Sequence, residues 1–179
     1  MRPGALPSVR RVVTAIGKGG RSFILEDGPP PVTREVQERP GFRASNLWRT
    51  DDTPAPIDAE DYVHEHHGVM PPARGTVLRV IDYPPRHPDP EERKRQAAAT
   101  FQRLYPDMRH DVESPRPGMH TTLTVDYAIV LKGTITALMD DGECDLHAGD
   151  ILIQRGTSHG WENRTDEFAR VAYVLIDGR

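Results

Sequence analysis

Short runs of apolar residues, each interrupted by glycine or proline, follow one another along most of the chain. Residues 9–16 (VRRVVTAI) and 21–27 (RSFILED) flank the turn GKGG, so they predict a β-hairpin. Residues 42–50 and 76–85 predict two further strands, the second of which ends at proline. The proline-rich segment 28–41 between them predicts an extended connection.

A helix is predicted at residues 90–105. Asp89 can accept hydrogen bonds from the first free amides, and Pro90 suits the first turn, where two glutamates follow it. Apolar side chains recur at near-helical spacing, at Ala98, Phe101 and Leu104. The other face is charged, so this helix is expected to cover one side of a sheet.

From residue 118 onward, strand patterns follow one another closely and are separated by tight turns. They lie at residues 118–123, 125–132, 134–139, 143–147, 150–154, 158–163 and 167–177. Strands this short, at this spacing, are typical of a closed barrel or sandwich. The sequence therefore predicts an all-β fold. The acidic, irregular stretch 51–75 is expected to be an exposed loop.

Composition and charge limit the partners and the cellular compartment that are expected for this chain. The 179 residues suit one domain, and the net charge of −4, without a basic stripe, argues against nucleic acid and anionic membranes. Cys144 is the one cysteine, so an intramolecular disulfide is excluded and a reducing compartment is indicated. The amino-terminal residues have no apolar signal core, and no apolar run approaches membrane-spanning length. A cytoplasmic protein is the simplest expectation.

Candidate chemistry lies on alternating positions of two predicted strands. In a continuous strand, His120, Thr122 and Asp126 face the same side, whereas Tyr127 faces the other. His159 and Trp161 also share a face. An antiparallel barrel could bring His159 beside His120.

Two imidazoles and a carboxylate can hold a divalent metal. The set of His120, His159 and Asp126 suits Fe, Mn, Ni or Zn and leaves coordination positions open. Each member also has a simpler interpretation. A barrel histidine can be hydrogen-bonded inside the core, and Asp126 can serve a turn or a strand ladder. Spacing alone does not decide between these interpretations.

Two sequence motifs resemble those of the cupin superfamily. The first is HTT…DYAIVLKG within residues 118–133, and the second is GDILIQRGTSHGWEN at residues 149–163. They are similar to motifs of small single-domain bacterial and fungal cupins. The resemblance implies a jelly-roll-like antiparallel barrel, often dimeric through exchanged amino-terminal strands. Residues 1–179 would form a single cupin domain, with an arm at 1–42, a barrel at 43–179 and the motif core at 118–163.

The motifs depart from the usual cupin pattern at three positions. Thr122 stands where the second histidine of the first motif is expected, and Asp126 stands where glutamate is expected. Arg155 replaces a proline of the second motif. The metal set that the resemblance implies is thereby reduced to His120, His159 and Asp126. A bound metal should be held more weakly than in a full cupin site, or be absent.

Other residues could contribute to the same pocket. The cluster His64–His67 could supply a missing ligand or be a solvated loop, and His110 lies shortly before the first motif. Thr122 and Trp161 are expected to line the pocket. Tyr127 could donate a hydrogen bond to a substrate there, or pack in the core.

Two functions are compatible with these features. The first is a metal-dependent enzyme that oxidises, isomerises, decarboxylates or cyclises a small organic molecule. The second is a metal-free cupin that binds a small ligand as a sensor or accessory protein, which the loss of a histidine at Thr122 favours. A homodimer is expected in either case.

Overall fold

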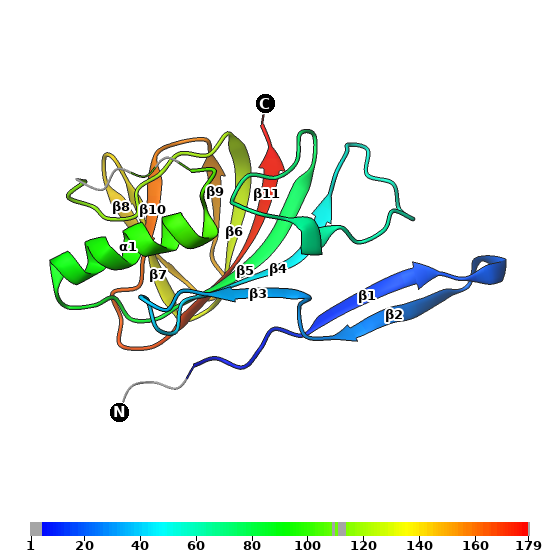
Figure 1. Ribbon diagram of the computed structural model, residues 1–179, viewed down its shortest axis with the longest axis horizontal. Helices are drawn as coiled ribbons and strands as arrows, with labels where there is room; N and C mark the ends of the chain where they lie inside the picture. Colours follow the sequence, from blue (N-terminus) through cyan, green and yellow to red (C-terminus); the bar gives the residue numbers. More distant parts are fainter. Residues whose placement is uncertain (1–4, 109, 111–113, 179) are drawn as a thin grey trace.

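The computed structural model describes residues 5–108, 110 and 114–178. Two antiparallel sheets face each other, with one long helix along one side and a two-stranded hairpin projecting away from the body (Figure 1). The predicted all-β architecture is therefore confirmed. In the described part of the chain, no helix is both long and apolar enough to cross a bilayer.

The larger sheet supplies most of the barrel wall. Its strands lie in the order β3 (Val32–Glu35), β4 (Arg43–Thr50), β5 (Thr76–Tyr83), β11 (Ala169–Asp177), β6 (Thr124–Lys132) and β9 (Ile151–Arg155). The smaller sheet has the order β10 (His159–Glu162), β7 (Thr134–Met139) and β8 (Glu143–His147). The carboxyl-terminal strand β11 lies between β5 and β6, so the two halves of the sequence share one sheet.

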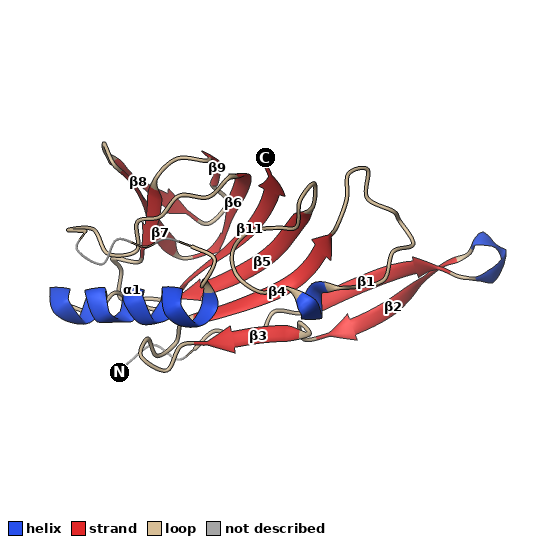
Figure 2. Cartoon of the chain, turned by 45° about the horizontal axis from the view of Figure 1, so that its top comes forward, coloured by secondary structure: helices blue, strands red, loops and turns tan. Residues whose placement is uncertain are grey.

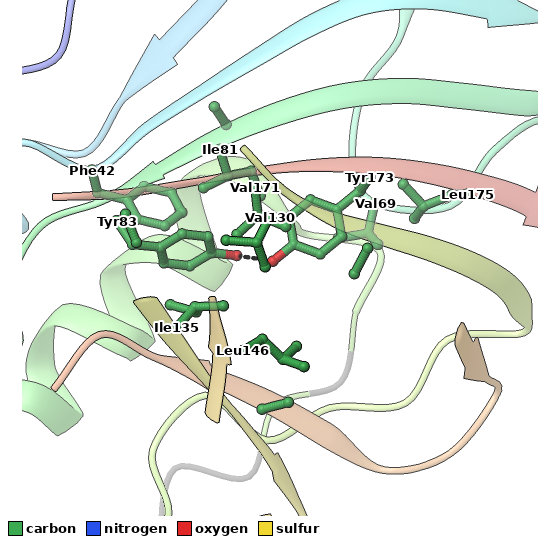
Figure 3. Close-up of a cluster of buried hydrophobic side chains, with 14 of the residues drawn as sticks. Phe42, Val69, Ile81, Tyr83, Val130, Ile135, Leu146, Val171, Tyr173 and Leu175 are labelled. Carbon is green, nitrogen blue, oxygen red and sulfur yellow. Dashed lines mark hydrogen bonds between the residues drawn. The ribbon is translucent and has the colours of Figure 1, made fainter. Parts of the chain in front are cut away.

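The hydrophobic core lies between the two sheets. Along β6 the buried positions alternate, so Ala128 and Val130 point inward while their neighbours face the outside. They meet Ile135 of the smaller sheet, as Figure 3 shows for Val130. Within this core the hydroxyls of Tyr83 and Tyr173 share a hydrogen bond of 2.8 Å, which satisfies two polar groups away from water.

Helix α1 (Pro90–Leu104) begins as the sequence predicts. The Asp89 side chain accepts a hydrogen bond of 3.0 Å from the Glu91 amide. The buried face carries Ala97, Thr100, Phe101 and Leu104. Phe101 and Leu104 are buried as predicted, whereas Ala97 is buried in place of Ala98.

The predicted hairpin is formed by β1 (Arg11–Ile16) and β2 (Ser22–Gly28), with a short 3-10 turn at Lys18–Gly20. Figure 2 shows it extending well beyond the two sheets. It therefore has few neighbours within its own chain. Large apolar side chains are exposed on it, at Val12, Ile16, Phe23, Ile24 and Leu25.

Three predictions about local structure were wrong. Residues 118–123 do not form a strand, since only an isolated bridge joins His120 to His159 and the chain bends at Leu123. The proline-rich connection contains strand β3, which lies at the edge of the sheet, where neighbouring prolines are tolerated. The loop 51–75 is exposed throughout residues 51–60, but beyond them Val63, His66 and Val69 are buried.

A charged cluster crosses the larger sheet at Asp82. Arg43 on β4 and Arg170 on β11 lie opposite Asp82 on β5, and both guanidinium groups bond its carboxylate, at 2.5–3.0 Å. The Asp82 side chain is only 4% exposed. The same arginines donate to the carbonyls of Leu6 and Pro7, so this cluster also holds the amino-terminal segment.

Candidate functional site

A cavity of about 120 Å³ lies between helix α1 and the inner faces of the strands. Helix residues such as Phe101 form one wall. The opposite walls include Tyr83 and Tyr173 from the larger sheet and Trp161 from the smaller one. Of the residues singled out in the two motifs, His120, Thr122, Asp126, His159 and Trp161 all line this cavity.

The two histidines lie side by side. The backbone amide of each donates to the carbonyl of the other, both at 2.9 Å, so His120 and His159 are fixed as a pair. Their ring centroids are 4.3 Å apart. The predicted return of the second motif beside the first is therefore present, although it uses a single bridge instead of a continuous strand.

Backbone carbonyls fix the proton position on both imidazole rings. His120 Nδ1 lies 2.9 Å from the Gly118 carbonyl oxygen, and His159 Nδ1 lies 3.0 Å from that of Thr157. A carbonyl only accepts, so each Nδ1 donates and each Nε2 keeps its lone pair. Burial and the neighbouring His159 ring lower the pKa of His120 to about 3, and burial also lowers the pKa of His159. Both rings are therefore neutral bases.

Asp126 faces the same cavity and is only 4% exposed. Burial raises its pKa to about 6. Among the described residues, Thr122 Oγ1 has no hydrogen-bond partner, whereas the Thr124 hydroxyl interacts with the Asp126 carboxylate and opposes the rise in its pKa. Buried polar atoms are nearly always satisfied in native proteins, so Thr122 Oγ1 indicates that the cavity receives a polar ligand.

The side chains meet only part of the requirement for a metal. Two Nε2 lone pairs, each on a ring held through its Nδ1, are the arrangement that metal-ligating histidines adopt. However, no three His, Cys, Asp or Glu side chains within the described residues are placed to hold an ion together. The set of His120, His159 and Asp126 is incomplete in this arrangement. The metal role remains a prediction.

The remaining aromatic residues differ in their placement. Trp161 packs edge-on against His159 at 6.1 Å and against Tyr173 at 5.3 Å, so it forms cavity wall. Tyr127 lies on the outer face of β6 and is 41% exposed. It lies outside the cavity because neighbouring strand residues face opposite sides. The prediction that Tyr127 lines the pocket is corrected accordingly.

The His64–His67 cluster does not converge on the histidine pair. His66 is buried and accepts a hydrogen bond at Nε2 from Arg79, while burial and Arg79 lower its pKa to about 4. His64 and His67 are exposed, and His67 Nδ1 contacts Arg34 at 2.9 Å. His66 thus supports a cavity arginine instead of supplying a ligand.

His110 lies near the pair but against the helix. Its ring stacks on Phe101 at 4.4 Å, and Phe101 in turn packs edge-on against His120 at 5.2 Å. Residues 109 and 111–113, which flank His110, lie outside the described residues.

Sequence reasoning missed several cavity residues. Arg39 reaches the cavity from the loop between β3 and β4, and Arg79 reaches it from β5. Strand periodicity could have identified Arg79, because it lies two residues before Ile81 on β5 and therefore on the same face. No local pattern distinguishes Arg39 from the other loop arginines.

Comparison with known proteins gives a consistent family. Residues 108–176 match the family model described as "Cupin domain". Over 189 aligned residues the chain is 28% identical to oryzines biosynthesis cluster protein J of Aspergillus oryzae. This alignment covers 97% of this chain and 85% of that protein. It is also 26% identical to the cupin-domain-containing oxidoreductase srdD of Neurospora crassa, in an alignment that covers 98% of this chain and 78% of that protein. Among solved structures, a cupin 2 conserved barrel domain protein from Salinispora arenicola is similar, with 17% identity, coverage of 80% and 82%, and a TM-score of 0.42.

Proposed function

Since this chain belongs to the cupin superfamily, we propose that it binds a small organic molecule in the barrel cavity and transforms it there. Two curated relatives, matched over nearly the whole chain, are named as a biosynthesis cluster protein and an oxidoreductase. Those names support a role in small-molecule metabolism. The fold alone does not decide the chemistry, because the same barrel carries both enzymes and binding proteins.

The neutral histidine pair is the observation that carries this proposal. His120 and His159 each offer an Nε2 lone pair, and Asp126 in the same cavity has a pKa near 6. The lowered pKa values make the two imidazoles weak bases. The Asp126 carboxylate, which is mostly ionised at neutral pH, can share with them the removal and return of a proton next to a carbonyl. Proton transfer of this kind suits isomerisation or cyclisation.

A metal-assisted reaction is the second candidate. It is favoured by the hydrogen bonds that orient both Nδ1 atoms away from the cavity. His120 and His159 would hold the ion, with Asp126 as a third donor after a change of its side-chain position. A bound Fe, Mn, Ni or Zn ion would polarise a substrate oxygen.

Hydrogen–deuterium exchange on model substrates tests the proton-transfer reaction. We expect the protein in D₂O to accelerate exchange of the α-hydrogens of enolisable ketones, followed by proton NMR. His120→Ala and His159→Ala should each lower the catalysed rate about 100-fold, the lower end for loss of a general base. The control is His147→Ala, because His147 is exposed on β8 and lies outside the cavity lining.

Elemental analysis of the same tag-free preparations separates the two candidates. Wild-type protein that exchanges protons without bound metal supports acid–base chemistry by the pair. Wild-type protein that contains about one equivalent of metal would support the metal-assisted reaction, provided that His120→Ala loses both the metal and the exchange activity. Absence of exchange by wild-type protein across the panel, with or without added ions, would count against both.

We also propose that two copies of the chain form a homodimer. The exposed apolar side chains of the hairpin have no cover in one chain. A second exposed apolar surface lies on the outer face of β6 and β9, at Val125, Tyr127, Leu131, Ile151 and Ile153. Apolar surfaces of this kind usually mark an interface, and the hairpin of one copy can cover the β6–β9 face of the other.

Light scattering after size-exclusion chromatography tests the dimer. Wild-type protein should have twice the mass of one chain, and Leu25→Asp should shift it to the monomer by placing a charge in the apolar contact. Ile57→Asp is the control, since Ile57 is 92% exposed in a loop away from both surfaces. A wild-type monomer at high concentration would refute the dimer.

A further inference from the structure

We infer that the molecule bound in the cavity is a small carboxylic acid and that Arg39 pairs with its carboxylate. This inference rests on the proposed function, because it assumes that the cavity is a ligand site. It adds the chemical class of the ligand and names a binding residue outside both cupin motifs.

Arg39 is half-buried at the cavity wall, where Glu162 acts on it electrostatically but forms no ion pair with it. Its guanidinium carbon lies 4.4 Å from the ring centroid of Phe42 and 5.9 Å from that of Tyr83. Among the described residues, no carboxylate forms an ion pair with it, and its side chain donates no hydrogen bond to them. A planar guanidinium held between aromatic rings keeps its donor fork available for a bidentate carboxylate.

Positively charged side chains outnumber negatively charged ones in the cavity lining. The lining carries four arginines and two carboxylates, namely Arg39, Arg79, Arg86, Arg93, Asp126 and Glu162. Glu162 is already shared, at 2.9 Å with Arg86 and at 2.8 Å with Arg164. Even with both carboxylates ionised, four arginines face two negative charges. The cavity is therefore net positive and would attract an anion.

The other buried arginine is already committed to protein groups. Arg79 is 3% exposed and donates to Asn46 Oδ1 at 3.1 Å, to His66 Nε2 at 3.1 Å and to the Gly68 carbonyl at 2.8 Å. All three partners are uncharged, so Arg79 keeps its positive charge and adds to the potential in the cavity. Arg39 is the group that remains available for direct contact.

The walls around these charges indicate the rest of the ligand. Phe42 and Tyr83 lie next to Arg39, while Phe101 and Trp161 lie next to the histidine pair. Such surfaces favour a flat, apolar body. A carboxylate at Arg39 would leave that body among these rings, in the cavity that His120 also lines.

Matched acid and amide probes test the inference by isothermal titration calorimetry. Benzoate is compared with benzamide, and trans-cinnamate with cinnamamide, on wild-type protein, Arg39→Gln and Arg95→Gln. Arg95→Gln is the control because it removes one positive charge from the outer face of α1, where Arg95 pairs with Glu92. We expect each acid to bind wild type and the control at least tenfold more tightly than its amide, and Arg39→Gln to lose that preference.

The outcomes distinguish this inference from the proposed function. Amides that bind as well as acids, or a preference for acids that survives in Arg39→Gln, would overturn the role of Arg39 and leave the ligand site intact. Binding of neither kind of probe would count against both. Arg39→Lys serves as a second variant if the glutamine variant fails to fold. It keeps the charge but loses the bidentate geometry, so a partial loss of acid affinity is expected.

Discussion

Replacing Asp82 by alanine should lower the free energy of unfolding by about 3–5 kcal/mol. The reason is that Arg43 and Arg170 both bond this carboxylate, and their side chains are only 17% and 14% exposed. Removing it leaves two guanidinium groups facing each other across the sheet without a counter-charge. Urea unfolding followed by circular dichroism measures the loss.

A surface ion pair provides the control for Asp82. Asp27→Ala removes a carboxylate that bonds Arg10 on the hairpin, where both side chains are largely exposed. Solvent screens exposed ion pairs and they contribute little to stability, so this variant should unfold close to wild type. If Asp82→Ala lost no more than Asp27→Ala, the cluster would not stabilise the sheet as described.

Gly133→Ala should be comparably damaging, at about 3 kcal/mol or more. Gly133 joins β6 to β7 with φ of 71°, a left-handed conformation that disfavours any side chain. A Cβ there would also lie 2.6 Å from the Phe168 carbonyl oxygen and 3.1 Å from Ala169 Cα. These are backbone atoms of the neighbouring strand, which cannot move aside cheaply. Thermal unfolding of the purified variant gives the size of the effect.

Gly142→Ala separates the two causes. Gly142 also has a left-handed φ, 96°, but a Cβ there would meet no atom within 4 Å. Its substitution should therefore cost only the conformational term, about 1–2 kcal/mol. Equal losses in the two variants would mean that the contact with Phe168 is relieved without strain.

Much of the barrel could be predicted because its signals are local. The turns at Gly133 and Gly149 and the alternation along β6 are visible in the printed sequence, and the structure places strands where they indicate. The pairing of His120 with His159 was also predictable from two motifs in antiparallel strands. The strand predicted at 118–123 was wrong because the backbone bridge is confined to His120, although buried and exposed residues continue to alternate as far as Thr122 and Thr124.

The rest of the site depends on contacts between distant segments. Arg39 is separated by more than forty residues from Tyr83, and the Tyr83–Tyr173 hydrogen bond joins residues ninety apart. Likewise, His66 looks like one of three loop histidines until β5 supplies Arg79 as its partner. Such residues acquire their roles through tertiary packing, which a single sequence does not encode in any short pattern.

Because the hairpin projects from the body, we expect proteases to cleave the chain first at its tip. Lys18 and Arg21 flank an exposed glycine turn, where trypsin-like enzymes cut most readily. A cut there would not free the first strand, because Arg11 bonds the Leu47 carbonyl and Asp61 in the body of the protein. The nicked molecule would persist as a complex of two fragments, the shorter of which could be exchanged for a synthetic peptide.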